Sequence, residues 1–452
     1  MLFYKIFNLK QEEFKLFLYA ASFIFLLFAS YAILRPLRDA FGIEGGDKEI
    51  KWLFLATFIT TLLASLLAMW LSTRVKRKNY LNAIYLFFAL NLLVFYIAMN
   101  QVSPHTQGFI WLCRVFYVWV SVFNLFVISS AWSLLADVFS RDSSKRLFGI
   151  ISAGASLGSI VGASMVSLLV THIGNTNFIF VSIVFLLLAL VIKWLLLQEA
   201  HNLAPNKESF MQRFQKPIGS KNPFVGFSLI MHSKYLLAFL AFILLLTSVS
   251  TFLYVEQARI IKEIFLTREA RTQAFANIDF IVQMASFIIQ IFFTAKIVEF
   301  LGMKWLLSLL GFVVGVGFIV LSFTHPMFLP FVIVMSLRRV GEYALVKPGR
   351  EMLFVPLDSD SKYKVKNFFD TVVYRGGDAI SSQLEGVLIK FGVGVSLLVG
   401  AGLSFIWGAL GLYLAKGYEN KIKEIKDSSS PNKEESKNLN NKESKILRGK
   451  SL

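Results

Sequence analysis

A succession of apolar runs, each about 20 residues long and separated by short charged segments, constrains this chain more than any other feature of its sequence. About 20 apolar residues in a helix cross the hydrocarbon core of a bilayer. We count twelve such runs, at residues 16–34, 52–73, 80–100, 108–136, 147–170, 178–197, 235–255, 273–295, 305–324, 327–346, 367–389 and 393–415. A hydrophobic content of 56% and a mean hydropathy of +0.63 exceed what a soluble core of this size needs. The sequence therefore predicts an all-α membrane protein with twelve transmembrane helices.

The predicted spans fall into two groups of six. Residues 132–159 and 353–382 form a weak internal repeat, because each places a short charged loop before a helix that contains small residues. Two six-helix halves related by an axis along the membrane normal are typical of the major facilitator fold, which holds a site near the bilayer midplane. The parts that we predict are an N-terminal six-helix half at 1–197, a cytoplasmic linker at 198–234, a C-terminal six-helix half at 235–415 and a disordered basic cytoplasmic tail at 416–452.

The fifth predicted span carries a stripe of small residues, which are Ser152, Gly154, Ala155, Ser156, Gly158 and Gly162. Small side chains let two membrane helices approach closely. We interpret the stripe as a packing surface, because it lacks the motifs of soluble nucleotide-binding enzymes.

The formal net charge of +18 is first of all a signal of topology. Most Lys and Arg fall in segments that lie on one side of the predicted spans, and cytoplasmic segments carry such an excess. We therefore expect a multi-pass protein of the bacterial inner membrane with both termini in the cytoplasm. The basic balance gives no reason to expect a nucleic-acid partner. We expect a monomer in contact with the lipid bilayer.

The residue types that carry most enzyme chemistry are sparse. Cys113 is the single cysteine, and the five histidines have none of the paired spacings that hold a metal. Neither a nucleophile beside a base nor an acidic metal cluster is evident in the sequence. We therefore expect no cofactor, no metal and no enzymatic activity.

Ionisable residues interrupt several spans, although a charge at the bilayer centre is costly and is a functional-site hypothesis by default. Arg338 and Glu342 lie four residues apart and can pair on one helix face. Arg339 lies about 100° round that helix and lacks such a local partner. Arg375 and Asp378, three apart, can also pair. The candidates for contact with a solute are Arg35, Arg38, Asp39, Arg114, Arg339 and Arg375, and those for charge balance or proton coupling are Glu342, Asp370 and Asp378.

The excess of arginine within the spans favours an anionic solute. A planar guanidinium holds phosphate or carboxylate with two parallel charge-assisted hydrogen bonds. The first of these candidates surround Pro36, which weakens the helix at the outer end of the first span. Two interpretations follow: the charges mark a site at a broken helix, which we favour, or the span ends there and the charges are solvated.

The stretch around Pro36 and two further stretches resemble those of a known family. Residues 33–41 read ILRPLRDAF, residues 342–358 read EYALVKPGREMLFVPLD, and residues 136–149 read ADVFSRDSSKRLFG. These stretches are similar to those of the bacterial and plastid ATP/ADP translocases, and the whole chain looks closest to the shorter bacterial NTP/NDP exchange transporters within the major facilitator superfamily. The resemblance implies nucleotide exchange. Carried over by position, it points to Arg35, Arg38, Asp39, Arg350 and Glu351.

Three functional hypotheses follow from the sequence. The first is a secondary active transporter that moves an anionic, phosphorylated, nucleotide-like solute by alternating access and exchange, with Arg350 and Glu351 in a gating loop at 347–366. The second is a proton-coupled exporter of an amphipathic metabolite or drug. The third is a transport-inactive scaffold or sensor that uses its basic tail.

Overall fold

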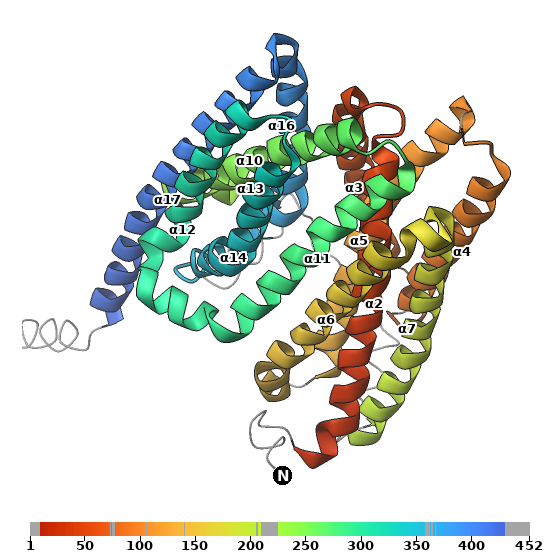
Figure 1. Cartoon of the computed structure of the whole chain (residues 1–452). Coiled ribbons are helices and arrows are strands. Elements are labelled where there is room, and N and C mark those ends of the chain that lie inside the picture. Colours follow the sequence, from red (N-terminus) through yellow and green to blue (C-terminus); the bar gives the residue numbers. More distant parts are fainter. Residues whose placement is uncertain are drawn as a thin grey trace, which may run out of the picture.

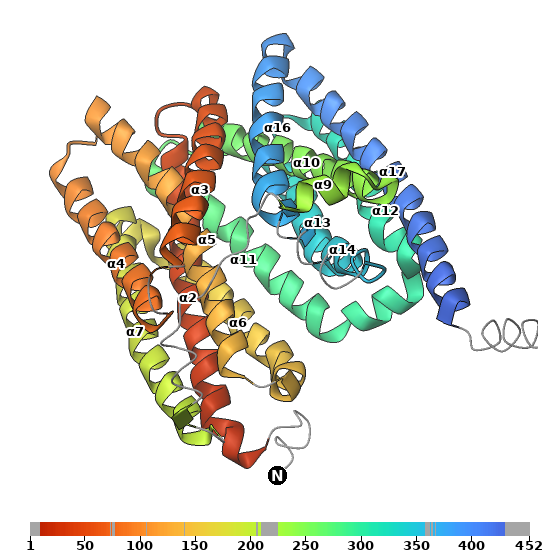
Figure 2. The ribbon, with the colours of Figure 1, turned by 180° about the vertical axis from the view of Figure 1, so that it is seen from behind.

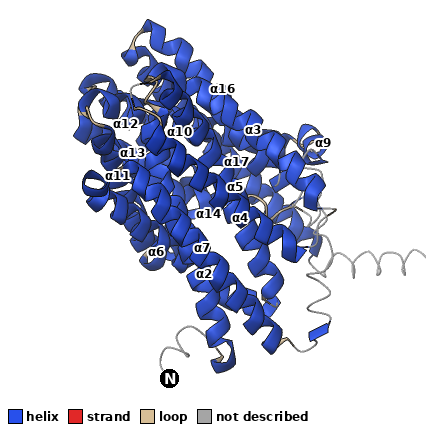
Figure 3. Ribbon diagram, turned by 90° about the vertical axis from the view of Figure 1, so that its right-hand side faces the viewer, coloured by secondary structure: helices blue, strands red, loops and turns tan. Residues whose placement is uncertain are grey.

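The computed structural model describes residues 10–72, 74, 77–104, 106–139, 141–204, 207–208, 225–357, 362, 365–366 and 368–429. These residues are almost entirely helical and contain no strand (Figure 3). Ten of the helices in the described ranges are long and apolar enough to cross a membrane. The predicted all-α membrane fold is confirmed.

The helices form two groups that are consecutive in the chain (Figures 1 and 2). The first group comprises α2 (Phe14–Gly42), α3 (Ile50–Ser72), α4 (Arg77–Gln101), α5 (Gln107–Val138), α6 (Arg141–Ile173) and α7 (Asn175–Leu203). The second comprises α10 (Lys234–Ile264), α11 (Arg268–Phe292), α12 (Thr294–Thr324), α13 (Phe328–Gly341), α14 (Lys347–Met352), α16 (Tyr374–Leu388) and α17 (Val393–Ser429), with the short α9 (Val225–Met231) before α10. A π-helical turn, Glu342–Val346, joins α13 to α14, and a second one, Phe369–Val373, precedes α16.

The first helix does not break at Pro36, contrary to our expectation, because α2 runs without interruption to Gly42. Proline removes one backbone donor from a helix. Here Leu34, Leu37 and Phe41 around it are at most 1% exposed. Their burial stabilises the last two turns, since most helical stability comes from tertiary packing. Arg35 and Arg38 therefore lie inside a continuous helix.

The predicted boundaries at the linker and the tail also need correction. The linker was expected from residue 198, but α7 continues to Leu203 and α9 lies within the linker. The tail was expected to be disordered from Lys416, but α17 extends to Ser429. Glu419 and Lys423 lie four apart there, a spacing that supports a helix in water. The rest of the predicted tail, residues 430–452, lies outside the described residues.

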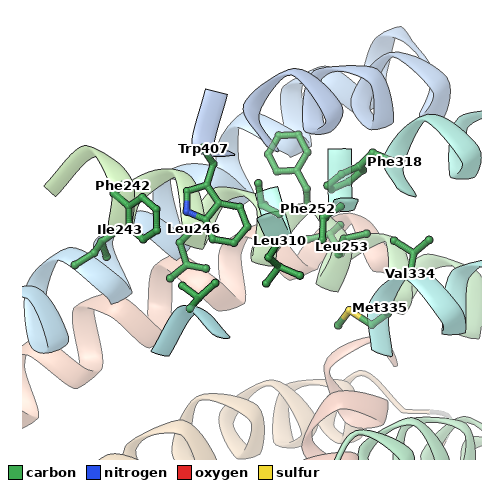
Figure 4. Packing of buried hydrophobic residues seen from close by; sticks show 14 of the residues in the cluster. Phe242, Ile243, Leu246, Phe252, Leu253, Leu310, Phe318, Val334, Met335 and Trp407 are labelled. Atoms are coloured by element: carbon green, nitrogen blue, oxygen red, sulfur yellow. The ribbon is translucent and has the colours of Figure 1, made fainter. Parts of the chain in front are cut away.

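Each group of helices has its own buried apolar cluster. One cluster is built almost wholly from α2 and α4–α7, and the other mostly from α10 to α17. In the second cluster Trp407 of α17 packs with Phe242 and Leu246 of α10 (Figure 4). Each group therefore has a core built mainly from its own helices.

The tightest helix pairs depend on glycine. A Cβ at Gly154 of α6 would lie 2.8 Å from the carbonyl oxygen of Ala21 on α2, and one at Gly162 would lie 2.6 Å from that of Ala29. The predicted packing role is thus confirmed for the glycines of the stripe. Its other members lie in the wall of a large cavity and are Ser152, Ala155 and Ser156.

The two groups are tied together at one end of the bundle. We call this the far end, where α2 ends at Gly42, and the opposite one the near end, where α2 begins at Phe14. At the far end Arg268 of α11 donates to Glu44 at 2.9 Å, Gln273 of α11 donates to the carbonyl oxygen of Ser167 at 2.9 Å, and Gln383 donates to that of Lys51 at 3.0 Å. These contacts hold α11 and α16 against the first group.

Candidate functional site

Three adjoining cavities lie between the two groups of helices. The largest encloses about 690 Å³ and is walled by α2, α5 and α6 on one side and by α11, Tyr343, Lys347 and Tyr374 on the other. A second, of about 420 Å³, shares Tyr343, Lys347 and Tyr374 with it, and a third, of about 130 Å³, shares Arg35 and Tyr374. Because they share walls, we treat the three as one central cavity.

Basic side chains outnumber carboxylates by five to four in the lining of the central cavity, and by four to one in its largest part. The basic residues are Arg35, Arg38, Lys347, Arg350 and Arg375. The carboxylates in its walls are those of Asp279, Glu342, Asp370 and Asp378.

Asp279 of α11 joins basic residues from both groups of helices. Its Oδ1 accepts a hydrogen bond of 2.6 Å from Nη1 of Arg339, and its Oδ2 lies 3.6 Å from Nε of Arg35. Arg339 is 3% exposed and lies behind Asp279, while Arg35 lines the cavity. The partner of Arg339 is therefore on another helix. Arg339, which we preferred over Arg338 for direct contact with a solute, is held by a carboxylate.

Arg38, which lines the third cavity, forms a second polar group with Asp39, which is buried behind the lining. Both Nε and Nη2 of Arg38 donate to Oδ1 of Asp39, at 2.8 and 2.6 Å, and the hydroxyl of Tyr254 donates to the same oxygen at 2.8 Å. Tyr117 donates to the Tyr254 hydroxyl at 3.2 Å, and its ring lies 5.0 Å from the Arg38 guanidinium. Tyr254 belongs to α10, so this cluster also joins the two groups.

The predicted pair of Arg338 and Glu342 is confirmed. Nη1 of Arg338 donates to Oε2 of Glu342 at 3.0 Å and to the Ser250 hydroxyl at 2.6 Å. The Tyr374 hydroxyl donates to the other oxygen of Glu342 at 3.1 Å. Both of these partners of Arg338 belong to its own half, and Glu342 also lines the second cavity.

The pair of Arg375 and Asp378 is also present, with Nη1 of Arg375 at 3.8 Å from Oδ2 of Asp378. Asp378 accepts a hydrogen bond of 3.0 Å from the Thr251 hydroxyl. Arg375 lines all three cavities, and its side chain is 29% exposed. Its guanidinium has room for a further anionic partner.

The predicted gating residues lie on helix and not in a loop. Arg350 belongs to α14, where its Nη2 is 3.6 Å from Oδ1 of Asp370 and 3.8 Å from Oε1 of Glu351. Glu351 accepts a hydrogen bond of 2.6 Å from Lys366. Arg350 and Asp370 line the second cavity, so the charged segment is part of the cavity wall.

Arg114 lies away from the central cavity, although we expected it there. Its Nη2 is 3.5 Å from Oε2 of Glu49, and its guanidinium is 4.7 Å from the ring centre of Trp111. The first turns of α5 place it at the far end, beside Gly45.

Uncharged polar side chains form a further part of the wall of the large cavity. They come from three helices and are Asn124 of α5, Ser152, Ser156 and Ser159 of α6, and Gln283, Ser286 and Gln290 of α11. Sequence reasoning did not single out this face as a site. It also missed Lys347, and it gave Asp279 only slight weight. Within the described residues no group of His, Cys, Asp or Glu is placed to hold a metal.

A separate network of ionisable groups lies at the far end of the second group. Arg259 of α10 pairs with Glu256 and donates to Glu385 of α16 at 2.7 Å. Nδ1 of His325, in the turn after α12, lies 2.6 Å from Oε1 of Glu256. This hydrogen bond raises the pKa of His325 above its ordinary value.

Comparisons with known proteins agree on the architecture. A family model described as Major Facilitator Superfamily matches residues 16–344. No curated protein matches the chain. A POT family transporter in complex with 5-aminolevulinic acid is similar in structure, with a TM-score of 0.62, 12% identity and coverage of 89% of this chain and 96% of that one. A mutant of the nucleoside transporter NupG gives a TM-score of 0.60 at 13% identity, covering 90% and 99% of the two chains.

A bacterial homologue of the human lysosomal transporter Spinster, in an inward-facing and unoccupied conformation, gives a TM-score of 0.60 at 15% identity, covering 91% and 98%. At these identities the likeness concerns the fold. The family match, over most of the chain, goes further: the protein belongs to the Major Facilitator Superfamily.

Proposed function

We propose that this transporter moves an anionic, phosphorylated, nucleotide-like solute across the bacterial inner membrane by exchange. The observation that carries the proposal is the cationic lining of the central cavity. Arg35, Arg375 and Lys347 line one cavity that lies between the two helix groups. Guanidinium and ammonium groups in a site of low dielectric bind phosphate oxygens strongly.

The pair of Arg35 and Asp279 supports exchange in particular. It joins α2 to α11 across the two groups, so any rearrangement that separates these helices at this level must break it. A solute anion that binds Arg35 replaces Asp279 as its counter-charge. The loaded transporter then reorients without exposing an unpaired arginine, whereas the empty one is held by its own carboxylate.

Arg339 acts in this scheme through Asp279 and not by direct contact. It holds Oδ1 of Asp279 while Oδ2 faces Arg35. Once a solute takes Arg35, Asp279 keeps one basic partner within its own half. The carboxylate is thereby never left unpaired in the membrane interior.

The predicted topology indicates the side of the membrane toward which the cavity would open. The two groups are tied at the far end, and the predicted cytoplasmic location of both termini places the near end in the cytoplasm. The conformation described here would then be the inward-facing one. Arg350, Glu351 and Asp370, toward the near end of the cavity wall, would gate access from the cytoplasm.

The deciding experiment is exchange by purified protein in proteoliposomes. Vesicles loaded with ATP, ADP or buffer are mixed with radiolabelled ATP, with and without a proton gradient. We expect uptake that depends on internal nucleotide and persists when the gradient is abolished. If labelled ATP is neither taken up nor exchanged under any of these conditions, the proposed solute is wrong and the second hypothesis becomes the leading one.

The positions of the Glu342 and Asp378 carboxylates support a second candidate function, that of a proton-coupled exporter. Both lie in the cavity wall, and Asp378 is 9% exposed. Intramembrane acids carry protons in many pumps. In that case the variants Glu342→Gln and Asp378→Asn would abolish coupled transport, while under exchange of an anion they would change mainly the affinity.

A further inference from the structure

The central cavity has two chemically different parts. Arg35, Arg38, Arg375 and Lys347 supply positive charge from α2, α16 and α14. The facing walls on α6 and the near half of α11 carry amides and hydroxyls. Beyond Asp279, no ionised side chain of these two helices is among the residues that line the large cavity.

The neutral part follows helical spacing on both sides. Ser152, Ser156 and Ser159 lie at intervals of four and three residues on α6, and Gln283, Ser286 and Gln290 lie at intervals of three and four on α11. Such spacing places each set on one face of its helix. We call these six residues the neutral face; it is contributed by both halves of the molecule.

Ser286 shows that the neutral face has unused hydrogen-bonding capacity. Its residue is 3% exposed, and its hydroxyl has no hydrogen-bond partner in the structure. Buried hydroxyls normally have one, and leaving one without a partner destabilises the fold. Within the described part of the chain, the side-chain amides of Gln283 and Gln290 also make no hydrogen bond, whereas Ser152 donates to the Phe148 carbonyl oxygen at 2.7 Å.

The size of the cavity argues that a ligand larger than a phosphate occupies it. A volume of about 690 Å³ lies within the range of sites for ligands the size of a drug or a nucleotide. A phosphate group on the arginines alone would leave the neutral face empty. The rings of Trp132 and Phe287 border the same space and offer flat surfaces to a planar group.

We propose that the neutral face binds the uncharged, hydrogen-bonding portion of the solute, the sugar and base of a nucleotide, while the basic side chains bind its phosphates. This inference rests on the proposed function and adds a division of labour to it. The residues that select the solute are then Gln283, Ser286 and Gln290 with the serines of α6. The arginines bind any polyphosphate.

The test compares two probes that share a triphosphate group and differ in the nucleoside. Binding of ATP and of inorganic tripolyphosphate to the purified full chain is measured for the natural protein and for the variants Gln283→Met, Gln290→Met and Ser286→Ala. We expect each variant to lose about tenfold in ATP affinity, the loss of one or two hydrogen bonds, with tripolyphosphate affinity unchanged within about twofold.

Ser286→Ala provides a second readout that a purely structural role would not give. Removing a hydroxyl without a partner should leave the melting temperature of the unliganded protein unchanged or higher while ATP affinity falls. Ser404→Ala is the matched control, because Ser404 is fully buried and donates to the Gly311 carbonyl oxygen at 2.8 Å, outside the cavity. It should lower the melting temperature and leave the ratio of the two affinities unchanged.

Two results would overturn the inference alone. One is an equal loss of ATP and tripolyphosphate binding in the variants, which would mean that the neutral face serves to close the two halves against each other. The other is unchanged ATP binding in all three variants. If the natural protein binds neither probe, the proposed function itself fails, and the inference falls with it.

Discussion

Replacing Asp279 by asparagine tests whether the pair that it forms with Arg35 makes the transporter an exchanger. The two groups lie 3.6 Å apart, and their side chains are 22% and 8% exposed. At an effective dielectric constant of about 20 their attraction is about 5 kcal/mol before the cost of desolvation. Exposed pairs retain about 0–1 kcal/mol, while breaking a buried pair costs about 3–5 kcal/mol. For this intermediate exposure we take the pair to contribute about 2 kcal/mol, which corresponds to a change of about 30-fold in the rate at which the empty transporter reorients.

The assay is uptake of labelled ATP into proteoliposomes with and without internal ATP. In the natural protein, vesicles without internal nucleotide should take up little label, because the empty transporter must break the Arg35 and Asp279 pair to return. In Asp279→Asn we expect uptake by empty vesicles to rise about 30-fold, so that the dependence on internal nucleotide largely disappears. Asp279→Glu, which retains the charge, should remain an exchanger.

Asp279→Asn also removes the charged partner of Arg339, which is 3% exposed, so its effect on stability must be controlled separately. Asp279→Asn leaves a buried guanidinium with a neutral partner and should lower stability by a few kcal/mol. The double variant Asp279→Asn with Arg339→Gln replaces the buried ion pair by two amides. It should regain stability while still taking up ATP without internal nucleotide. If Asp279→Asn folds and still requires internal nucleotide as strictly as the natural protein, the reasoning is refuted.

Three further changes probe the gate, the helix packing and the far-end network. Arg350→Gln should lower the exchange rate about tenfold with little change in KM, since its partners lie toward the near end of the cavity; a rise in KM at constant rate would place it in the binding site. Gly158→Val should lower the free energy of unfolding by more than about 3 kcal/mol, because the new side chain would overlap the backbone of α2. Gly402→Ala, also in a helix but with open space around the new methyl group, should raise the free energy of unfolding by up to about 1 kcal/mol; thermal unfolding measures both. His325 has a raised pKa, so its bond to Glu256 stabilises the folded state fully below the unfolded pKa of about 6.5, and this stability is lost as pH rises through the folded pKa. Melting curves from pH 5.5 to 8.5 should show this decline in the natural protein and not in His325→Gln.

Local patterns in the sequence were sufficient for the long helices and for pairs within one helix. Apolar runs predicted each of the ten long apolar helices in the described ranges, because crossing a bilayer sets the length of a helix. The pair of Arg338 and Glu342 follows from a spacing of four residues. The small residues of α6 predicted its close approach to a neighbour, and α2 proved to be that neighbour.

Partners from different helices could not be predicted in this way. Arg339 was preferred over Arg338 for contact with a solute because Arg338 has Glu342 four residues away as a local partner. The structure shows that Asp279 of α11, 60 residues earlier in the chain, pairs with Arg339. Arg114 similarly finds Glu49 on another segment. Such pairs depend on how the helices cross, which a single sequence does not encode in any local pattern. The neutral face, divided between α6 and α11, was missed for the same reason.

The two π-helical turns explain why Lys347 in particular was missed. In an α-helix, residues five apart are separated by about 140° round the axis and do not share a face. In a π turn the backbone N–H bonds to the carbonyl five residues earlier, as the N–H of Lys347 does to Glu342. Lys347 thereby lies over Glu342, and both line the second cavity.

The second π turn, Phe369–Val373, has the same effect on another acid and base five residues apart, Asp370 and Arg375, which line that cavity as well. In an α-helix, an acid and a base five residues apart would point in different directions, so their spacing provided no reason to group them. Because each helix contains a π turn, the two carboxylates and the two cations lie together in the wall of the second cavity. The stretch from Glu342 to Lys347 is therefore one continuous element of the cavity, and the boundary that we predicted between span and loop at Val346 divides residues that act together.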